Sequence, residues 1–228
     1  KIEEIYYCKL DDKQQEVYQA HVDSIKSELN KGSGAVLAML TRLRQICITP
    51  ELVYEEPFES AKIKLAIELI QRAILANHRI LLFTQFSSVF PIIEKLLDEL
   101  NIKHFTLDGK TKALNRKEMV DEFNNNENIK VFMISLKAGG TGLNLVGADM
   151  VIHLDPWWNS SAENQATDRA YRIGQSKKVN VIKLVCKDTI EEKVLLLQNL
   201  KKELADSIIY SENENFKMTK EDILEMLE

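Results

Sequence analysis

The sequence is poor in the residues that build metal sites, disulfide frameworks and membrane spans. It has three cysteines and four histidines among 228 residues, and Cys8, Cys47 and Cys186 stand far apart, with no CxxC pair and no histidine nearby. A zinc site is therefore not expected, and the dispersed histidines are interpreted as structural. Scattered thiols are typical of a reducing cytoplasm. No window approaches the uninterrupted apolar length of a membrane span.

A complete phosphate-binding loop is also missing. Residues 108–111 read Asp-Gly-Lys-Thr, but the P-loop pattern needs a glycine five positions before Gly109, and position 104 is histidine. No Asp-Glu pair suited to Mg²⁺ ends a predicted strand. If the protein uses a nucleotide, its phosphates and metal are expected to be held elsewhere.

The charge excludes little. The formal net charge is −5, which is unusual for a DNA-binding protein, but residues 76–187 hold 15 basic and 12 acidic residues, a balance of +3, and the rest of the chain holds 15 and 23. Local patches, rather than net charge, determine contacts with phosphates. A mildly basic central region with acidic flanks permits DNA binding without demanding it.

The hydrophobic pattern predicts an α/β protein. Residues 1–10 are expected to be extended, with helices over residues 11–29, 35–48, 61–76, 87–100, 115–124, 161–173, 189–209 and 219–227. Strands are expected over residues 79–84, 104–107, 130–134, 150–154 and 179–186. Strands that alternate with helices and are apolar on both faces favour a mostly parallel sheet with helices on both faces. Ligands of such sheets bind at the carboxyl ends of the strands.

A glycine-rich loop follows one of these strands. Gly139, Gly140 and Gly142 lie within Ser-Leu-Lys-Ala-Gly-Gly-Thr-Gly-Leu-Asn-Leu at 135–145. Glycines allow a ligand to approach the backbone, and exposed N–H groups suit phosphate oxygens. The alternative is a tight turn from strand to helix that binds nothing.

A later helix and its approach carry further candidates. Gln165, Arg169 and Arg172 are spaced i, i+4 and i+7, which places them on one helical face. They are either a surface ion-pair stripe or, since guanidinium binds phosphate in a bidentate manner, a site for γ-phosphate transfer. Trp157 and Trp158 are adjacent, so their side chains diverge, and one is expected in the core and the other exposed.

The order of these segments resembles the second motor lobe of a SWI/SNF-family ATPase of helicase superfamily two. Residues 165–175 fit the family's Gln-Ala-x-Asp-Arg-x-x-Arg-x-Gly-Gln, and the other matches are the loop at 135–145, Leu-Asp-Pro-Trp-Trp-Asn at 154–159, Phe-Thr-Gln-Phe at 83–86, Leu-Asp-Gly-x-Thr at 107–111, Ser-x-Lys at 60–62 and Ile-Glu-Glu-Lys at 190–193. Residues 43–50 resemble Leu-Arg-x-x-Cys-Asn-His-Pro, with Ile48 and Thr49 replacing Asn-His, and are expected only to pack. The amino-acid usage favours a bacterial source.

The resemblance implies a RecA-like α/β lobe over residues 61–187, preceded by a helical segment and linker (1–60) and followed by C-terminal brace helices (188–228). Arg169 and Arg172 would be arginine fingers that reach ATP on the other lobe. The residues near ATP would be Gly142, Gln165, Arg169 and Arg172. The residues facing DNA would be Gln85, Ser87, Ser135, Lys137, Gly140, Thr141 and Trp158.

The resemblance also implies cofactors and partners. ATP and Mg²⁺ would be held mainly by a first lobe of the same polypeptide, which is absent from this sequence, and no metal ligand is assigned here. Double-stranded DNA would be the substrate of a DNA-dependent ATPase. The protein would act in the cytoplasm, on the nucleoid, if it is bacterial, or in the nucleus if it is eukaryotic. No membrane partner is implied. The isolated fragment is expected to be inactive. An RNA-acting helicase of the same superfamily and a non-catalytic interaction module stay open as alternatives.

Overall fold

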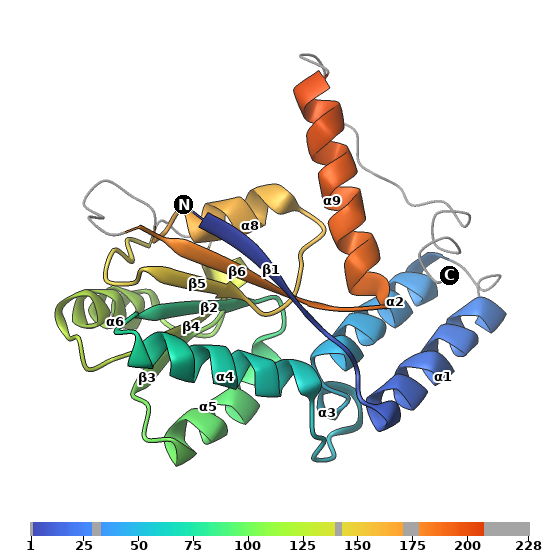
Figure 1. Ribbon diagram of the computed structural model, residues 1–228, viewed down its shortest axis with the longest axis horizontal. Helices are drawn as coiled ribbons and strands as arrows, with labels where there is room; N and C mark the ends of the chain where they lie inside the picture. Colours follow the sequence, from blue (N-terminus) through green and yellow to red (C-terminus); the bar gives the residue numbers. More distant parts are fainter. Residues whose placement is uncertain (1, 29–32, 140–142, 171–177, 208–228) are drawn as a thin grey trace.

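The computed structural model describes residues 2–28, 33–139, 143–170 and 178–207 (Figure 1). Within these ranges, six strands form one parallel sheet in the order β1-β6-β5-β2-β4-β3. The strands are β1 (Ile2–Cys8), β2 (Ile80–Thr84), β3 (His104–Leu107), β4 (Val131–Ser135), β5 (Met150–His153) and β6 (Asn180–Cys186). The predicted parallel sheet is therefore confirmed.

Helices connect these strands. They are α1 (Asp12–Glu28), α2 (Ser33–Ile48), α3 (Glu51–Tyr54), α4 (Ala61–Leu75), the short 3₁₀ helix η2 (Ser87–Val89), α5 (Phe90–Glu99), α6 (Ala113–Asn125), α7 (Leu136–Gly139), α8 (Ser160–Thr167) and α9 (Ile190–Ser207). None of the helices in the described part of the chain is long and apolar enough to cross a membrane.

The central strands are buried on both faces because helices cover both. Every residue of β2 and β4 is buried. Successive side chains point to opposite faces, so Ile80 and Leu82 pack in a core with α4 and α5, whereas Leu81 and Phe83 pack in a core with α6 and α8. Figure 1 shows α4 and α5 together on one side of the sheet and α8 on the other. The predicted coverage of both faces is confirmed.

A third core joins the helical additions to one edge of the sheet. Its buried residues come from α1, α2, α9 and the end of β6: Tyr18, Val22, Ile25, Leu40, Leu43, Ile46, Cys47, Cys186, Ile190 and Val194. Strand β1 lies at the edge of the sheet but precedes the predicted lobe, residues 61–187. It pairs with β6 along its whole length, with Ile2 opposite Asn180 and Cys8 opposite Cys186. In Figure 1, β1 leaves the sheet and leads directly into α1. The N-terminal segment thus contributes a strand as well as helices.

Two predicted helices differ in the structure. Residues 87–100 form η2 followed by α5, because Pro91 lacks the N–H group that would continue one α-helix through this position. The helix predicted over residues 161–173 ends at Thr167. Beyond it, the N–H groups of Arg169 and Ala170 donate to the carbonyls of Ala166 and Thr167, both at 3.1 Å. These i→i+3 bonds tighten the backbone into a turn.

Candidate nucleotide and DNA interface

The predicted DNA contacts that the structure describes lie at the carboxyl ends of three adjacent strands. Gln85 and Ser87 follow β2, Ser135 ends β4 and Lys137 follows it, and Trp158 follows β5. In the sheet, β2 lies between β4 and β5, and Thr84 is the register partner of Ser135. The fold therefore brings these segments to the edge where open parallel sheets bind ligands.

Asp155 organises this edge, although the sequence interpretation gave it no individual role. Its buried carboxylate accepts hydrogen bonds from the Thr84 hydroxyl (2.6 Å), the Gln85 backbone N–H (3.1 Å) and the Gln85 side-chain amide (3.3 Å). The half-buried Gln85 side chain is thus held in place by its neighbour. Three bonds to one carboxylate fix the turn after β2 against the turn after β5.

Arg44 of α2 supplies the charge that balances Asp155. Its guanidinium donates to Asp155 Oδ2 at 3.3 Å and to the Pro156 carbonyl at 2.6 Å. It also lies 5.5 Å from the ring centroids of both Phe86 and Trp158, within the range of cation–π attraction. Residues 43–50 pack as expected, and Arg44 in addition pairs with Asp155.

The sequence did contain a signal for Arg44. Arg44 stands between Leu43 and Ile46, which pack in the core formed by α1, α2 and α9, and a buried charge is normally paired. Its partner could not be identified, because Asp155 lies 111 positions along the chain.

The two tryptophans do not divide into one buried and one exposed side chain. Both are half-buried, Trp157 against the core with α6 and α8 and Trp158 against the helical core. The side chains diverge as expected. The exposed partner is missing because α2 and Arg44 cover Trp158.

Arg44→Lys tests whether the planar guanidinium matters. Lysine keeps the charge but loses the planar guanidinium, whose Nη2 bonds two acceptors and whose carbon lies near two aromatic rings. We expect the free energy of unfolding to fall by about 1–2 kcal/mol and the tryptophan emission spectrum to change. Urea unfolding followed by fluorescence measures both. Arg42→Lys, at an exposed position of α2, is the matched control; equal effects in the two variants would contradict the assignment.

The glycine-rich loop is described only at its two ends. Buried Ser135 accepts a hydrogen bond from the Ala138 N–H at 3.3 Å, and Lys137 is exposed. At the other end, the Leu145 N–H donates to the Arg169 carbonyl at 3.0 Å, which ties the loop to the turn after α8. The predicted contacts Gly140, Thr141 and Gly142 lie outside the described residues.

Gln165 and Arg169 do not share a helical face. Gln165 is exposed on α8, whereas Arg169 is 5% exposed. The prediction assumed a continuous α-helix, but the helix has already ended at Thr167, and the tighter turn changes the direction of later side chains. Arg172 lies outside the described residues.

Helix α9 contacts this region through Gln198. Its side-chain amide donates to the Trp157 carbonyl and to Glu163 of α8. Burial raises the pKa of the Glu163 carboxyl, while Lys183, at 3.7 Å, and the Gln198 bond act in the opposite direction. The predicted brace region is therefore joined by hydrogen bonds to the segments on both sides of Asn159, the N-cap of α8.

Residues 108–111 form a turn of their own. Asp108 Oδ1 accepts from the backbone N–H groups of Lys110 at 2.9 Å and Thr111 at 3.2 Å. This is the local arrangement by which Asp stabilises turns. The P-loop-like sequence Asp-Gly-Lys-Thr therefore has a structural role as a turn, and no nucleotide is needed to account for it.

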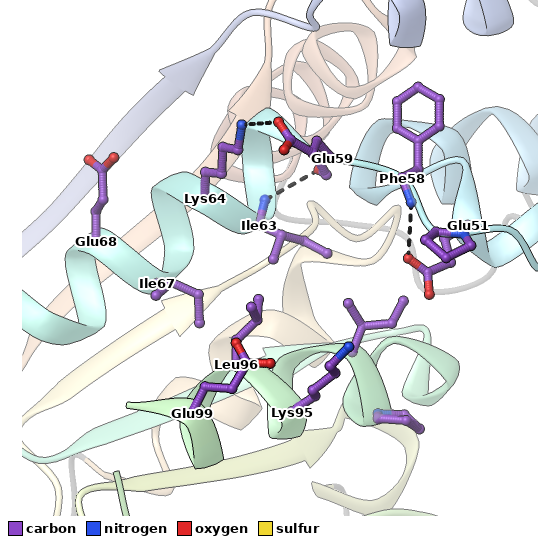
Figure 2. Close-up of a pocket in the computed structure, with 14 residues that line it drawn as sticks. Glu51, Phe58, Glu59, Ile63, Lys64, Ile67, Glu68, Lys95, Leu96 and Glu99 are labelled. Carbon is purple, nitrogen blue, oxygen red and sulfur yellow. Dashed lines mark hydrogen bonds and ion pairs between the residues drawn. The ribbon is translucent and has the colours of Figure 1, made fainter. Parts of the chain in front are cut away.

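A groove of about 780 Å³ lies between α4, α5 and residues 57–60, and residues 108–111 do not line it. Figure 2 shows Ile63, Ile67 and Leu96 within it, with charged side chains such as Glu68, Lys95 and Glu99 around them. None of the predicted ATP or DNA contacts lines it.

Comparisons with known proteins agree on one relationship. The family model described as helicase conserved C-terminal domain matches residues 61–174. An uncharacterized ATP-dependent helicase of Mycoplasma pneumoniae is 38% identical over 233 residues, which cover 100% of this chain but only 23% of that protein. The chain thus spans less than a quarter of this relative.

Solved structures of the same family match this chain over nearly its whole length. The SWI2/SNF2 ATPase C-terminal domain of Sulfolobus solfataricus is 32% identical, with a TM-score of 0.76 over 92% of this chain and 90% of that one. The SWI2/SNF2 ATPase core of the same organism, solved in complex with double-stranded DNA, is 34% identical, with a TM-score of 0.79 over 91% of this chain and 46% of that one.

Proposed function

The chain belongs to the SWI2/SNF2 ATPases as their helicase conserved C-terminal domain, and from that premise we propose that it is the second motor lobe of an ATP-dependent double-stranded-DNA translocase. Its parallel sheet, covered by helices on both faces, is the RecA-like lobe of this family. Residues 61–187 are proposed as the lobe itself, with 1–60 and 188–228 as helical additions that support it.

The observation that supports this function best is the Asp155-centred edge of the sheet. Gln85, Ser135 and Trp158 lie there at the ends of three adjacent strands, and exposed Lys137 adds a positive charge. The ammonium group of exposed Lys137 and the half-buried hydroxyl of Ser87 suit contacts with a DNA backbone. The amide of Gln85 is held by Asp155 and Ser135 is buried, so these two residues would have to be uncovered to contact DNA. We assign DNA contact to Gln85, Ser87, Ser135, Lys137, Gly140, Thr141 and Trp158. Such contacts read no base edges, so movement along DNA of any sequence follows.

The first lobe is proposed to hold Mg²⁺ and the ATP phosphates. The buried carboxylate of Asp155, at the same edge of this lobe, is already bound by Arg44, Thr84 and Gln85. This lobe would contribute Gly142, Gln165, Arg169 and Arg172 to the nucleotide. The two guanidinium groups would stabilise the charge that develops during phosphoryl transfer.

ATP would bind in the cleft between the lobes. Closing the cleft would bring the turn after α8 to the γ-phosphate, and the bond from Leu145 to the Arg169 carbonyl links that turn to the glycine-rich loop. A change at the nucleotide would therefore move a loop that faces DNA. Alternation between the closed and open cleft would shift this lobe's grip along one strand.

Steady-state ATP hydrolysis by the intact protein tests this function. We expect duplex DNA to raise the rate at least tenfold, single-stranded RNA to have little effect, and the isolated fragment to be inactive. Stimulation by RNA rather than duplex DNA would identify an RNA-acting helicase. Absence of turnover with either nucleic acid would contradict the motor and favour an interaction module.

A further inference from the structure

The three cysteines, far apart in the sequence, meet in the folded chain. Cys8 ends β1, Cys186 ends β6 and Cys47 lies in α2. Cys8 and Cys186 are register partners on adjacent parallel strands, and their Sγ atoms are 3.4 Å apart. The Cys186 thiol also donates to the Cys47 carbonyl at 3.2 Å. The fold thus brings together thiols that are far apart in the sequence.

A buried ion pair lies beside the thiols. Lys62 donates to both carboxylate oxygens of Glu191, and both side chains are fully buried. The Glu191 carboxylate also accepts from the Cys186 backbone N–H at 2.8 Å. Ligand atoms of Cys47, Cys186 and Glu191 lie within 4.8 Å of one another, a spacing that a metal ion could use. The Lys62 ammonium already serves as the cation of this cluster, so a metal would have to displace it.

Cys8 and Cys186 are better placed to bond to each other. Disulfides need Cα atoms about 4.4–6.8 Å apart, and register partners on neighbouring strands, which lie about 4.7–4.9 Å apart, satisfy this range. Cys8 is only partly buried, whereas Cys186 is fully buried. Hydrogen bonding to Cys186 raises the pKa of the Cys8 thiol, and burial raises that of Cys186. Both thiols are therefore protonated at neutral pH, and their oxidation is slow.

We propose that Cys8 and Cys186 form a reversible disulfide that fastens edge strand β1 to β6 when the protein meets a small disulfide oxidant, RSSR. The Cys8 thiol loses its proton and attacks one RSSR sulfur, which forms a mixed disulfide and releases RS⁻. The Cys186 sulfur then displaces the second RS⁻ from Cys8. The two thiols give up two electrons and two protons, and RSSR becomes two RSH.

Such a bond would hold the helical additions against the sheet. Beyond Cys8 the chain continues into α1 and α2, and α2 carries Arg44, which supports the Asp155 edge. Covalent closure of the β1–β6 edge would limit the separation of α1 and α2 from the lobe. Cytosolic disulfides are mostly transient and redox-sensing, which is how this one would act.

The test uses the intact protein treated with oxidised glutathione, then with N-ethylmaleimide, and mapped by mass spectrometry of its peptides. We expect a cross-linked pair of peptides containing Cys8 and Cys186, lost after dithiothreitol, with Cys47 alkylated after unfolding. Cys8→Ser should abolish the cross-link and Cys47→Ala should leave it, with both variants checked for folding by circular dichroism. The readout is chemical and does not depend on ATP turnover, so it is independent of the proposed motor function.

Two results would overturn the proposal. In the first, oxidised glutathione oxidises the urea-unfolded protein, but in the folded protein Cys8 and Cys186 both stay free or Cys47 bonds to Cys186. In the other, Zn²⁺ binds stoichiometrically and protects all three thiols from alkylation, which would identify a metal site instead. If Cys8→Ser fails to fold, the Cys47→Ala variant alone decides, since its two remaining cluster thiols either cross-link or do not.

Discussion

Arg172→Ala in the intact protein is expected to lower the rate of DNA-stimulated ATP hydrolysis by about 10³-fold or more, the scale of a lost arginine finger. DNA affinity should stay within a few-fold, because the proposed DNA contacts lie on other segments. The guanidinium would act on charge that forms only during phosphoryl transfer, so kcat should fall while the KM for ATP changes little. Single-turnover hydrolysis and DNA binding by fluorescence anisotropy measure the two effects separately.

Three further variants sharpen this prediction. Arg172→Lys keeps the charge but not the bidentate fork and should remain strongly impaired. Arg72→Ala removes an exposed arginine from α4 and should behave as the unchanged protein. Arg169→Ala should combine lost turnover with lower stability, since Arg169 is buried. Normal turnover by Arg172→Ala would eliminate it as a finger.

Glu191→Gln is expected to destabilise the chain by about 3–5 kcal/mol, the usual result when one partner of a buried ion pair is removed. Glutamine keeps the size of the side chain and an acceptor for the Cys186 N–H, but it leaves the fully buried Lys62 ammonium without a counter-charge. Urea unfolding followed by circular dichroism measures the loss as a lower transition midpoint.

Two controls separate burial from ion pairing as such. Lys64 and Glu59 form an exposed pair at 2.5 Å, and Glu59→Gln should leave the midpoint unchanged. Adding Lys62→Met to Glu191→Gln should restore part of the lost stability, because the uncompensated charge is then removed. A midpoint for Glu191→Gln equal to that of Glu59→Gln would show that the buried pair contributes nothing.

The sequence predicted the sheet because local and long-range preferences agree there. Residues 104–107 form the expected strand, and the apolar runs ending at Thr84 and near Ser135 are central strands. Buried parallel strands need no partner information to be recognised, since their apolar character on both faces is visible in the sequence. The position of Ser135, where the glycine-rich loop begins, at the carboxyl edge followed from the same reasoning.

The features that could not be predicted from the sequence depend on contacts between distant parts of the chain or on local backbone geometry. The Asp155–Arg44 pair joins residues 111 positions apart, and the Cys8–Cys186 pair joins residues 178 positions apart. The end of α8 at Thr167 also escaped prediction, because helical spacing continues through Arg172 while the backbone tightens after Asp168. The spacing i, i+4, i+7 places side chains on one face only where the α-helix continues through all three positions.

The bond network of Gln198 gives α9 a mechanical meaning. The helix has 18 residues, and at about 1.5 Å per residue it is a rod of about 27 Å. In Figure 1 it projects away from the sheet. It is anchored near its middle by Gln198, which bonds the Trp157 carbonyl and Glu163 of α8. Any tilt of α9 would therefore be transmitted through Gln198 to the start of α8 and to the Trp157 carbonyl.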